Sequence, residues 1–123
     1  MKKSKFILAL ASCFILANGS CSKGKDFKYN LVSYTSGFNN EVIKASNTYE
    51  YYFVKFYSDK KYELSFKMKD NSKQSTTFGK YEKKDNKYYV IANDTDLVYT
   101  ITNGGKNLEC SIFVVDFYFE LED

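Results

Sequence analysis

Three cysteines carry the most reactive side chains of this 123-residue sequence, at positions 13, 21 and 110. A thiolate can bind a metal, carry a covalent modification or form a disulfide. Cys13 lies in an apolar leader, which leaves Cys21 and Cys110, too few thiolates for a zinc site. If these two pair, the disulfide closes a loop of almost the whole chain and stabilises it by about 4 to 5 kcal/mol. If Cys21 is modified instead, Cys110 is a lone thiol.

Residues 1 to 20 are predicted to be a secretory signal peptide. Residues 1 to 5, MKKSK, carry three lysines and no acid, and residues 6 to 17, FILALASCFILA, are apolar apart from Ser12. A charged start followed by an apolar segment is typical of such a signal. The apolar segment is too short to cross a bilayer as a helix, which takes about 20 residues. We therefore expect no transmembrane helix in the mature protein.

The residues before Cys21 resemble the end of a bacterial lipoprotein signal. In that signal small residues, here Gly19 and Ser20, precede an invariant cysteine that becomes the lipidated first residue. The resemblance implies acyl chains such as palmitate on Cys21 and a polar tether over residues 21 to 26. The sequence departs from the pattern at Asn18, where the lipoprotein family usually has an aliphatic residue. In a competing interpretation, a general signal peptidase cuts after Gly19.

Two pairs of adjacent tyrosines are the candidate ligand contacts. Tyr51 and Tyr52 form one pair, and Tyr88 and Tyr89 form the other. Successive side chains of a strand point to opposite faces, so each pair places one ring outside the core. An amphipathic ring of this kind suits an apolar or carbohydrate ligand at a barrel mouth or sheet face. The alternative is cross-strand aromatic packing with the hydroxyls at the surface.

The groups of common catalytic and metal chemistry are missing from the sequence. It contains no histidine, the usual general base and zinc ligand. Neither a glycine-rich phosphate loop nor a G-x-S-x-G elbow occurs. Asp94 and Asp96 offer oxygen ligands for Ca²⁺, but no EF-hand series surrounds them, and we interpret both as turn residues. We therefore expect no enzyme, no cofactor and no metal site.

Charge argues against a nucleic-acid partner. The formal net charge of the chain is +3, and this excess equals the lysines of residues 1 to 5. The mature part is then formally neutral and lacks the basic surplus that phosphate contacts require. Lysines concentrate between residues 60 and 87. We interpret them as solvated strand faces, or alternatively as a surface for anionic lipid headgroups.

Alternation of apolar and polar residues dominates from residue 27 onward and predicts strands. In KYELSFKMK, residues 61 to 69, the apolar set faces inward and the polar set, which includes Ser65, faces water. One dry and one wet face is typical of an antiparallel sheet. The predicted strands are residues 27 to 34, 48 to 57, 61 to 69, 77 to 84, 87 to 92, 97 to 102 and 107 to 115, followed by a last strand to residue 121.

Three details of these strands carry further predictions. The inward set from Leu108 to Val114 includes Cys110, which is therefore expected to be a small core residue. After Val115 the inward set changes phase, which predicts a β-bulge or a break between two strands. Gly79 inside a strand predicts a sharp bend or a close backbone approach.

Short polar segments at residues 58 to 60, 85 to 86 and 103 to 105 predict hairpin turns. Residues 35 to 47 lack alternation and predict a long loop with one helical turn around residues 41 to 44. Seven or eight strands joined in this way predict a single all-β domain over residues 27 to 123. We expect a small antiparallel meander barrel, with a curled open or two-layer sheet as the second choice.

The domain resembles small bacterial lipocalin-like lipoprotein domains. The resemblance rests on YNLVSYTSG (29 to 37), FGKYEKKDNKYYVI (78 to 91) and TNGGKNLECSI (102 to 112). It implies a meandering β-barrel on a lipid tether, in a group whose members mostly lack an assigned activity. Lipocalins proper are longer and carry a Gly-x-Trp near the first strand, whereas this chain has no tryptophan. A barrel of about eight short strands can be filled by its own side chains, so no deep ligand-holding calyx is implied.

Three hypotheses about function remain. The first is a lipid-anchored binding module on the extracytoplasmic side of the cell envelope, with a small apolar or carbohydrate ligand. The second is an envelope interaction or inhibitor protein that binds another protein through a sheet edge or the loop at residues 35 to 47. The third is a secreted, unlipidated domain with a disulfide between Cys21 and Cys110.

Overall fold

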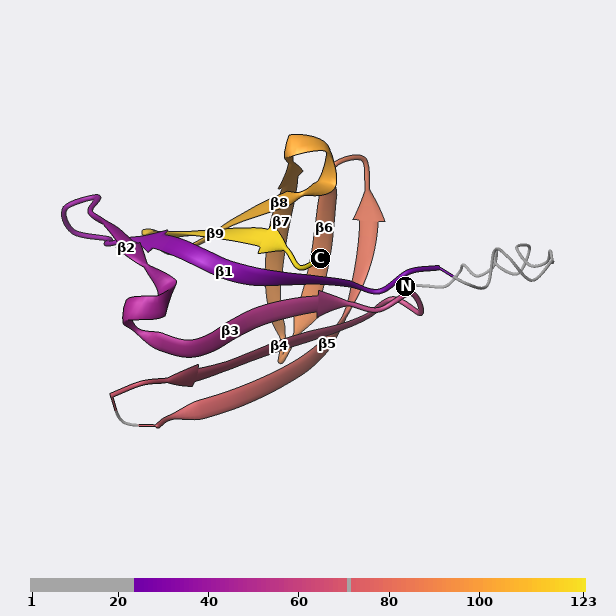
Figure 1. Ribbon diagram of the computed structural model, residues 1–123. Coiled ribbons are helices and arrows are strands. Elements are labelled where there is room, and N and C mark those ends of the chain that lie inside the picture. The colour runs from indigo at the N-terminus through magenta and orange to yellow at the C-terminus, as the bar shows by residue number, and fades with distance from the viewer. Residues whose placement is uncertain (1–23, 71) are drawn as a thin grey trace, which may run out of the picture.

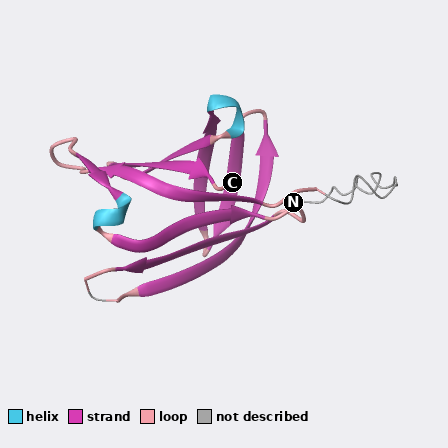
Figure 2. Cartoon of the chain, viewed as in Figure 1, coloured by secondary structure: helices cyan, strands magenta, loops and turns pink. Residues whose placement is uncertain are grey.

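The computed structural model describes residues 24 to 70 and 72 to 123, so the predicted signal peptide and Cys21 lie outside the described residues. Strands dominate this part of the chain, as predicted, with two short 3-10 helices beside them (Figures 1 and 2). None of its helices is long and apolar enough to cross a membrane. The elements are β1 (Phe27–Thr35), β2 (Val42–Lys44), η3 (Ala45–Asn47), β3 (Tyr49–Phe56), β4 (Lys61–Met68), β5 (Gln74–Lys84), β6 (Lys87–Ala92), β7 (Thr95–Thr102), η4 (Asn103–Gly105), β8 (Asn107–Ile112) and β9 (Val115–Leu121).

The strands form a closed barrel, which confirms the predicted architecture. The sheet order is β2-β1-β3-β4-β5-β6-β7-β8-β9, all neighbours are antiparallel, and β1 also pairs with β9. Leu31 of β1 lies opposite Phe119 of β9. Eight strands therefore close on themselves, and β2 is an additional short strand beside β1. Closure removes the unpaired edges that would otherwise attract another chain.

Side chains alternate along the pleat except at two register shifts, between Leu31 and Ser33 in β1 and between Tyr49 and Tyr51 in β3. In β6 Tyr88 is buried while Ile91 is exposed on the outer surface. In β4 Ser65, predicted for the wet face, is buried. It lies between Phe53 of β3 and Thr76 of β5, and its hydroxyl is 3.0 Å from the Thr76 hydroxyl. Larger neighbours cover this small residue on the outside of the barrel, so its burial does not place it in the core.

The phase change after Val115 marks a break between two strands rather than a bulge. β8 ends at Ile112 and β9 begins at Val115, with Phe113 and Val114 between them. Val114, predicted to face inward, is 67% exposed because it lies in the turn beyond the last strand pair. Cys110 is buried in β8, which confirms its predicted place in the core.

The segment predicted as a long loop with a helical turn at residues 41 to 44 contains β2 and η3 instead. β3 pairs with β1 only as far as Asn30, so the second half of β1 has a free edge. β2 occupies this edge, with Lys44 opposite Ser33. The helical turn follows it, at Ala45–Asn47. A helical turn was therefore correctly expected in this segment, but pairing with β1 displaces it toward β3.

Gly79 confirms the close backbone approach predicted for it. A Cβ atom at this position would lie 2.4 Å from the Ile91 carbonyl oxygen and 2.8 Å from the Ala92 Cβ. Such distances exclude any side chain, so glycine lets β5 cross close to the end of β6. The predicted turn between these two strands is also present, and Asp85 takes the left-handed conformation there (φ 57°).

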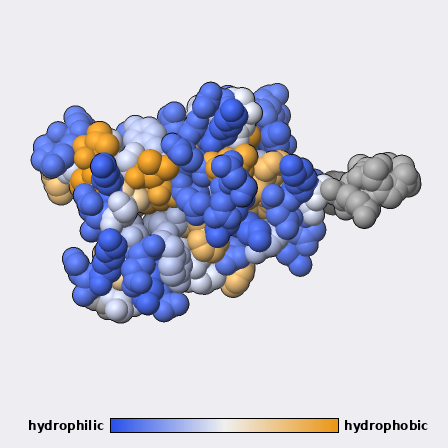
Figure 3. Space-filling view, viewed as in Figure 1, coloured by the Kyte–Doolittle hydropathy of each residue, from blue (hydrophilic) through white to orange (hydrophobic). Residues whose placement is uncertain are grey.

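The meander places alternate turns at opposite ends of the barrel (Figure 1). One end, here named the open end, holds the chain entry at Phe27, the last strand residue Leu121 and the turns after β3, β5 and β7. The other, named the closed end, holds the 36 to 41 loop, η3 and the turns after β4, β6 and β8. The face of the barrel seen in Figure 3 is mostly hydrophilic, with several hydrophobic patches.

Candidate functional site

The middle of the barrel is filled by its own side chains. The Tyr62 and Tyr99 hydroxyls lie 2.6 Å apart and form a buried hydrogen bond, so neither is left unsatisfied. The Phe56 ring packs against these two rings, with centroid distances of 5.5 and 5.6 Å. These buried, mutually packed rings occupy the middle of the described barrel.

Aromatic rings also fill the closed end. Tyr52 stacks on Phe66 with centroids 5.5 Å apart and on Phe117 at 6.0 Å. Tyr49 meets the Tyr52 ring edge-on at 5.0 Å. On the side of β1 and β3, η3 buries Ala45 against the core. Burial raises the pKa of the Tyr52 hydroxyl well above its usual value.

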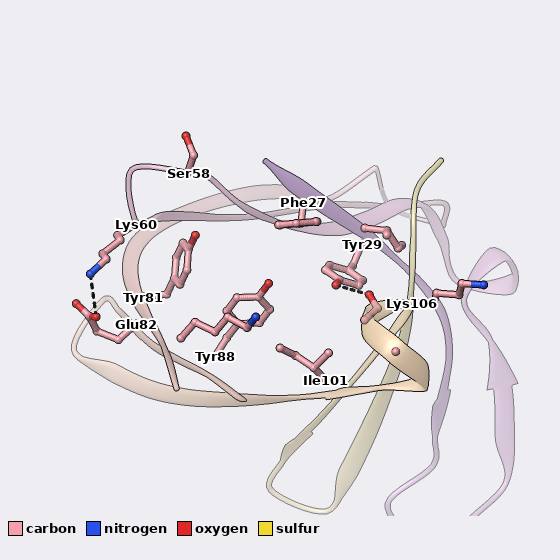
Figure 4. Close-up of a pocket in the computed structure, with 13 residues that line it drawn as sticks. Phe27, Tyr29, Ser58, Lys60, Tyr81, Glu82, Tyr88, Ile101 and Lys106 are labelled. Carbon is pink, nitrogen blue, oxygen red and sulfur yellow. Dashed lines mark hydrogen bonds and ion pairs between the residues drawn. The ribbon is translucent and has the colours of Figure 1, made fainter. Parts of the chain in front are cut away.

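The open end holds a pocket of about 570 Å³, a size typical of small-molecule sites (Figure 4). Its walls come from β1, β5, β6, β7 and β9, which are far apart in the sequence but meet where the barrel closes. The inner wall consists of Phe27, Tyr29, Tyr81, Tyr88, Ile101 and Leu121. The rim consists of Ser58, Lys60, Glu82, Lys83, Gly104, Gly105 and Lys106.

Stacked rings form the deep side of the pocket. Tyr88 lies flat on Phe56, with centroids 3.9 Å apart and planes at 13°. Tyr81 meets the Tyr88 ring edge-on at 5.3 Å. Because Phe56 belongs to the filled middle of the barrel, it holds the Tyr88 ring in place from below. The pocket thus has a rigid aromatic wall that offers flat apolar surface.

Tyrosine hydroxyls add polar groups to this wall. Tyr29 donates a hydrogen bond of 2.7 Å to the Gly105 carbonyl oxygen, and Tyr81 donates one of 2.6 Å to the Tyr57 carbonyl oxygen. Each bond fixes a ring at the pocket and leaves the hydroxyl oxygen able to accept a hydrogen bond. Burial raises the pKa of Tyr29 to about 12 and that of Tyr81 to about 12, so both hydroxyls are neutral at physiological pH.

Cations outnumber anions at the pocket rim. Lys60 forms an ion pair with Glu82 at 3.2 Å, and both side chains are largely exposed (Figure 4). Lys83 and Lys106 add two further positive charges. The lysines of the rim can pair with the acidic group of a ligand whose apolar part contacts the rings below. Asp26 and Asp59 also lie near Tyr81, so anions border the pocket as well.

The four sequence-predicted tyrosines do not form one site. Tyr88 lies in the open-end pocket, whereas Tyr52 belongs to the closed-end cluster. Tyr51 and Tyr89 face outward and are 39% and 43% exposed. This confirms that each adjacent pair places one ring outside the core. The two outward rings do not share a place either, because Tyr51 lies on β3 and Tyr89 on β6.

The two pocket tyrosines that the sequence reasoning missed are Tyr29 and Tyr81. Both face inward near the open end of their strands, and both are partners in hydrogen bonds to turns. The available signal was their position close to a predicted hairpin turn or to the start of the domain. Adjacency in a strand sends two rings to opposite faces, so neighbouring tyrosines do not predict a shared site.

The described residues hold no group of three or more side chains suited to a metal ion. Asp94 lies in the turn between β6 and β7 with a left-handed φ of 61°, as its interpretation as a turn residue requires. Asp96 lies within β7 opposite Ile91, so its interpretation as a turn residue is wrong. The β6 to β7 turn is shorter than expected, because Thr95 already pairs with Ala92.

Comparison with known proteins supports the fold. No family model and no curated protein matches the sequence. The barrel is similar to the crystal structure of a lipocalin-like protein from Bacteroides uniformis, with a TM-score of 0.55 and 13% sequence identity. The match covers 76% of this chain and 94% of that chain. At this level of identity the likeness concerns the fold, and the eight-stranded barrel is lipocalin-like.

Proposed function

We propose that this lipocalin-like barrel is a lipid-anchored binding protein of the cell envelope, on the extracytoplasmic side, that holds a small anionic amphiphile at its open end. The observation that carries the proposal is the convergence of Tyr29, Tyr81 and Tyr88 beneath a lysine-rich rim. Rings with hydroxyls suit an apolar or sugar-like body, and the lysines suit an acidic group. The filled middle of the barrel limits the ligand to a size that fits the mouth.

The position of the chain entry supports an anchor close to this pocket. The Ser58 amide donates a hydrogen bond of 2.9 Å to the Asp26 carboxylate, so the chain enters the domain beside the pocket rim. Cys21 lies five residues earlier, a span of at most about 18 Å. With lipid on Cys21, the pocket mouth lies near the membrane surface, and its lysines near the headgroups.

Burial of Cys110 favours lipidation over the disulfide alternative. Its side chain is 4% exposed, and burial raises the pKa of its thiol to about 11. Pairing with Cys21 would require the tether to enter the packed interior, or β8 to open. A thiol in this environment is also a poor nucleophile for disulfide exchange.

A direct binding titration tests the ligand site. The purified Cys21→Ser protein is titrated with anilinonaphthalene sulfonate, an aromatic anion that matches the proposed class. We expect saturable binding that Tyr88→Ala weakens by at least about tenfold, because it removes the ring at the base of the pocket. The double variant Lys83→Gln, Lys106→Gln should weaken it by about 3- to 10-fold and reduce its salt dependence.

The matched control is Tyr89→Ala, which removes the adjacent but outward-facing ring. It should leave the affinity within about twofold. Absence of saturable binding, or an equal loss in the control and in Tyr88→Ala, would show that the open-end pocket is not the site.

Intact mass spectrometry tests the anchor. The mature protein, isolated from the membrane fraction of a bacterial host, should begin at Cys21 and carry the mass of two or three acyl chains. The Cys21→Ser variant should lack this mass and leave the membrane fraction. A mature chain that begins at Ser20 without acyl mass would refute lipidation.

Two fully exposed phenylalanines support a second candidate, an envelope protein that binds a protein partner through its closed end. Phe38 in the 36 to 41 loop is 101% exposed, and Phe113 in the β8 to β9 turn is 99% exposed. The two turns touch, since a Cβ on Gly37 would lie 2.3 Å from a Val114 methyl group. A photo-crosslinking residue at position 38 should then capture one reproducible protein in intact cells. The same residue at position 84, at the open end, is the control.

A further inference from the structure

The outer surface of the barrel carries an apolar patch that the proposed ligand site does not involve. Four apolar side chains on three adjacent strands form it, and we name it the β5–β7 patch: Phe78, Tyr89, Ile91 and Val98. Phe78 and Ile91 are 66% and 63% exposed, well above the usual exposure of large apolar residues. Clustered exposed apolar residues on a soluble domain mark an interaction surface.

Strand register shows that the four residues are contiguous. Ile91 lies opposite Lys80 on one side and opposite Asp96 on the other, and Tyr89 lies opposite Val98. Residues that pair directly share a face, and diagonal neighbours two positions away remain within reach of long side chains. The patch therefore runs diagonally across β5, β6 and β7, with Lys80 and Glu82 on its β5 flank and Asp96 on its β7 flank.

On the opposite side of the barrel, lysine side chains lie over outward-facing aromatic rings, whereas the β5–β7 patch has no such cover among the contacts of the described residues. There the Lys28 ammonium lies 4.4 Å from the centre of the Phe53 ring, and the Lys55 ammonium lies 4.8 Å from that of Tyr57. Lysine side chains thus lie over the outward rings of β3 and of the turn that follows it. On β5 to β7 the flanking charges stand beside the apolar residues, which stay exposed.

We propose that a second copy of this chain docks on the β5–β7 patch. A two-fold axis parallel to β6 brings Ile91 onto Ile91 of the partner subunit and exchanges the two flanks. Lys80 then faces Asp96 of the partner subunit, and the second, equivalent ion pair forms by symmetry. The row formed by Lys80, Ile91 and Asp96 therefore supplies both the apolar centre and the complementary charges of an isologous contact, in which both subunits use the same surface.

The size of the patch sets the strength of this contact. A strip three strands wide on a convex barrel buries less than the roughly 800 Å² per partner of a standard interface. The dimer is therefore weak, with a dissociation constant on the order of 1 μM to 1 mM. Anchoring of two chains in one membrane raises their effective concentration and favours the contact.

Analytical ultracentrifugation of the Cys21→Ser protein tests the proposal. A concentration series from about 1 μM to about 1 mM should show reversible dimers. Ile91→Lys should abolish them. Lys80→Asp alone and Asp96→Lys alone should each weaken association by at least about tenfold, since each places like charges in contact. The double variant Lys80→Asp, Asp96→Lys should recover the wild-type dissociation constant within about threefold.

The control is Val42→Lys, which places a lysine on β2, away from the patch, at a residue of similar exposure (66%). It should leave the dissociation constant unchanged. A protein that stays monomeric over the whole series refutes the proposal. So does a double variant that fails to recover, which would assign any association to another surface. Anilinonaphthalene sulfonate binding should be unchanged in every variant, so this test is independent of the ligand proposal.

Discussion

The two ends of the barrel are built from the same kinds of residue but differ in what covers them. At the closed end the connection between β1 and β3 is long, and η3 packs Ala45 against the core beside the stacked rings of Tyr49 and Tyr52. At the open end the connections are short turns, which reach the rim but not across it. A pocket of about 570 Å³ thus lies where the chain is too short to cover the barrel. Tyr29 and Tyr81 bond to the turns there, and Tyr29 and Tyr88 also bond to each other.

The largest expected effect tests the stacking at the closed end. Tyr52→Ala should lower the free energy of unfolding by about 3 to 4 kcal/mol, because it removes a ring packed against Phe66 and Phe117. Tyr81→Ala at the open end should cost about 1 to 2 kcal/mol, because its ring borders an open pocket. Urea unfolding followed by circular dichroism measures both.

The matched control is Tyr51→Ala, the outward neighbour of Tyr52, which should cost less than about 1 kcal/mol. Equal losses for Tyr52 and Tyr81 would remove the distinction between a packed end and an open one.

Alkaline pH should lower the free energy of unfolding, because the pKa values of Tyr29 and Tyr81 are higher in the folded than in the unfolded chain. An unfolded tyrosine titrates near pH 10, while the folded pKa of Tyr29 and of Tyr81 is about 12. Between these values the unfolded chain loses protons that the folded chain keeps, so stability is full below pH 10 and falls as pH rises through 12. We expect these two groups to contribute a loss on the order of 2 kcal/mol after solvent screening at the open end.

Urea unfolding at a series of pH values, together with tyrosinate absorbance, measures this loss. Tyr29→Phe should reduce the slope above pH 10. Stability that stays constant up to pH 12 would contradict the assignment of raised pKa values at the open end.

A smaller loss of stability is expected when the hydrogen bond between Tyr62 and Tyr99, in the middle of the barrel, is removed. Tyr62→Phe leaves the Tyr99 hydroxyl buried without its partner and should cost about 1 to 2 kcal/mol. Adding Tyr99→Phe removes the orphaned group, so the double variant should be no less stable than the single one. Unfolding of the four proteins in a double-mutant cycle measures the coupling. Additive losses would mean that water or another group satisfies the lone hydroxyl.

The smallest expected change in stability comes from glycine substitutions in the turns at the closed end. Asn93 and Asp94 adopt left-handed conformations that suit them, whereas Phe113 adopts φ 57°, which strains a bulky residue. Phe113→Gly should therefore stabilise the barrel by about 0.5 kcal/mol. Asn93→Gly is the control and should change stability by no more than a few tenths of a kcal/mol. Destabilisation by Phe113→Gly would indicate that the exposed ring packs against the barrel.

Local patterns predicted the strands and most turns but misplaced several details. The alternation around Cys110 was sufficient to place it inside, because a strand fixes the direction of each side chain. The pairing of β2 with β1 escaped prediction, since Val42–Lys44 is too short to alternate and forms only because β1 extends beyond β3. Val114 was misjudged because alternation continues through a two-residue turn without a visible break.

The candidate site could be predicted only in part. The sequence predicts Tyr88 as a candidate ligand contact beside a hairpin turn. Tyr29 and Tyr81, which line the same pocket, lie in two other strands, β1 and β5. The alternation places Tyr29 on one face with Phe27 and Leu31, but it does not show which of Tyr88 and Tyr89 points inward or where Tyr81 points. The meeting of the three pocket tyrosines depends on closure between β1 and β9 and on the register of β5 against β6, which no local pattern specifies.

The sequence by itself determined an all-β meander with an inward Cys110, and it pointed to Cys21 as the residue for an anchor. These features depend on near neighbours, namely the period of two, the residues suited to tight turns and the segment before a cysteine. The tertiary structure decided which end of the barrel stays open, which tyrosines line it and which outer face stays uncovered. Those features depend on strands paired across the whole chain, because only closure of the barrel brings Phe27, Tyr81 and Leu121 to one pocket wall.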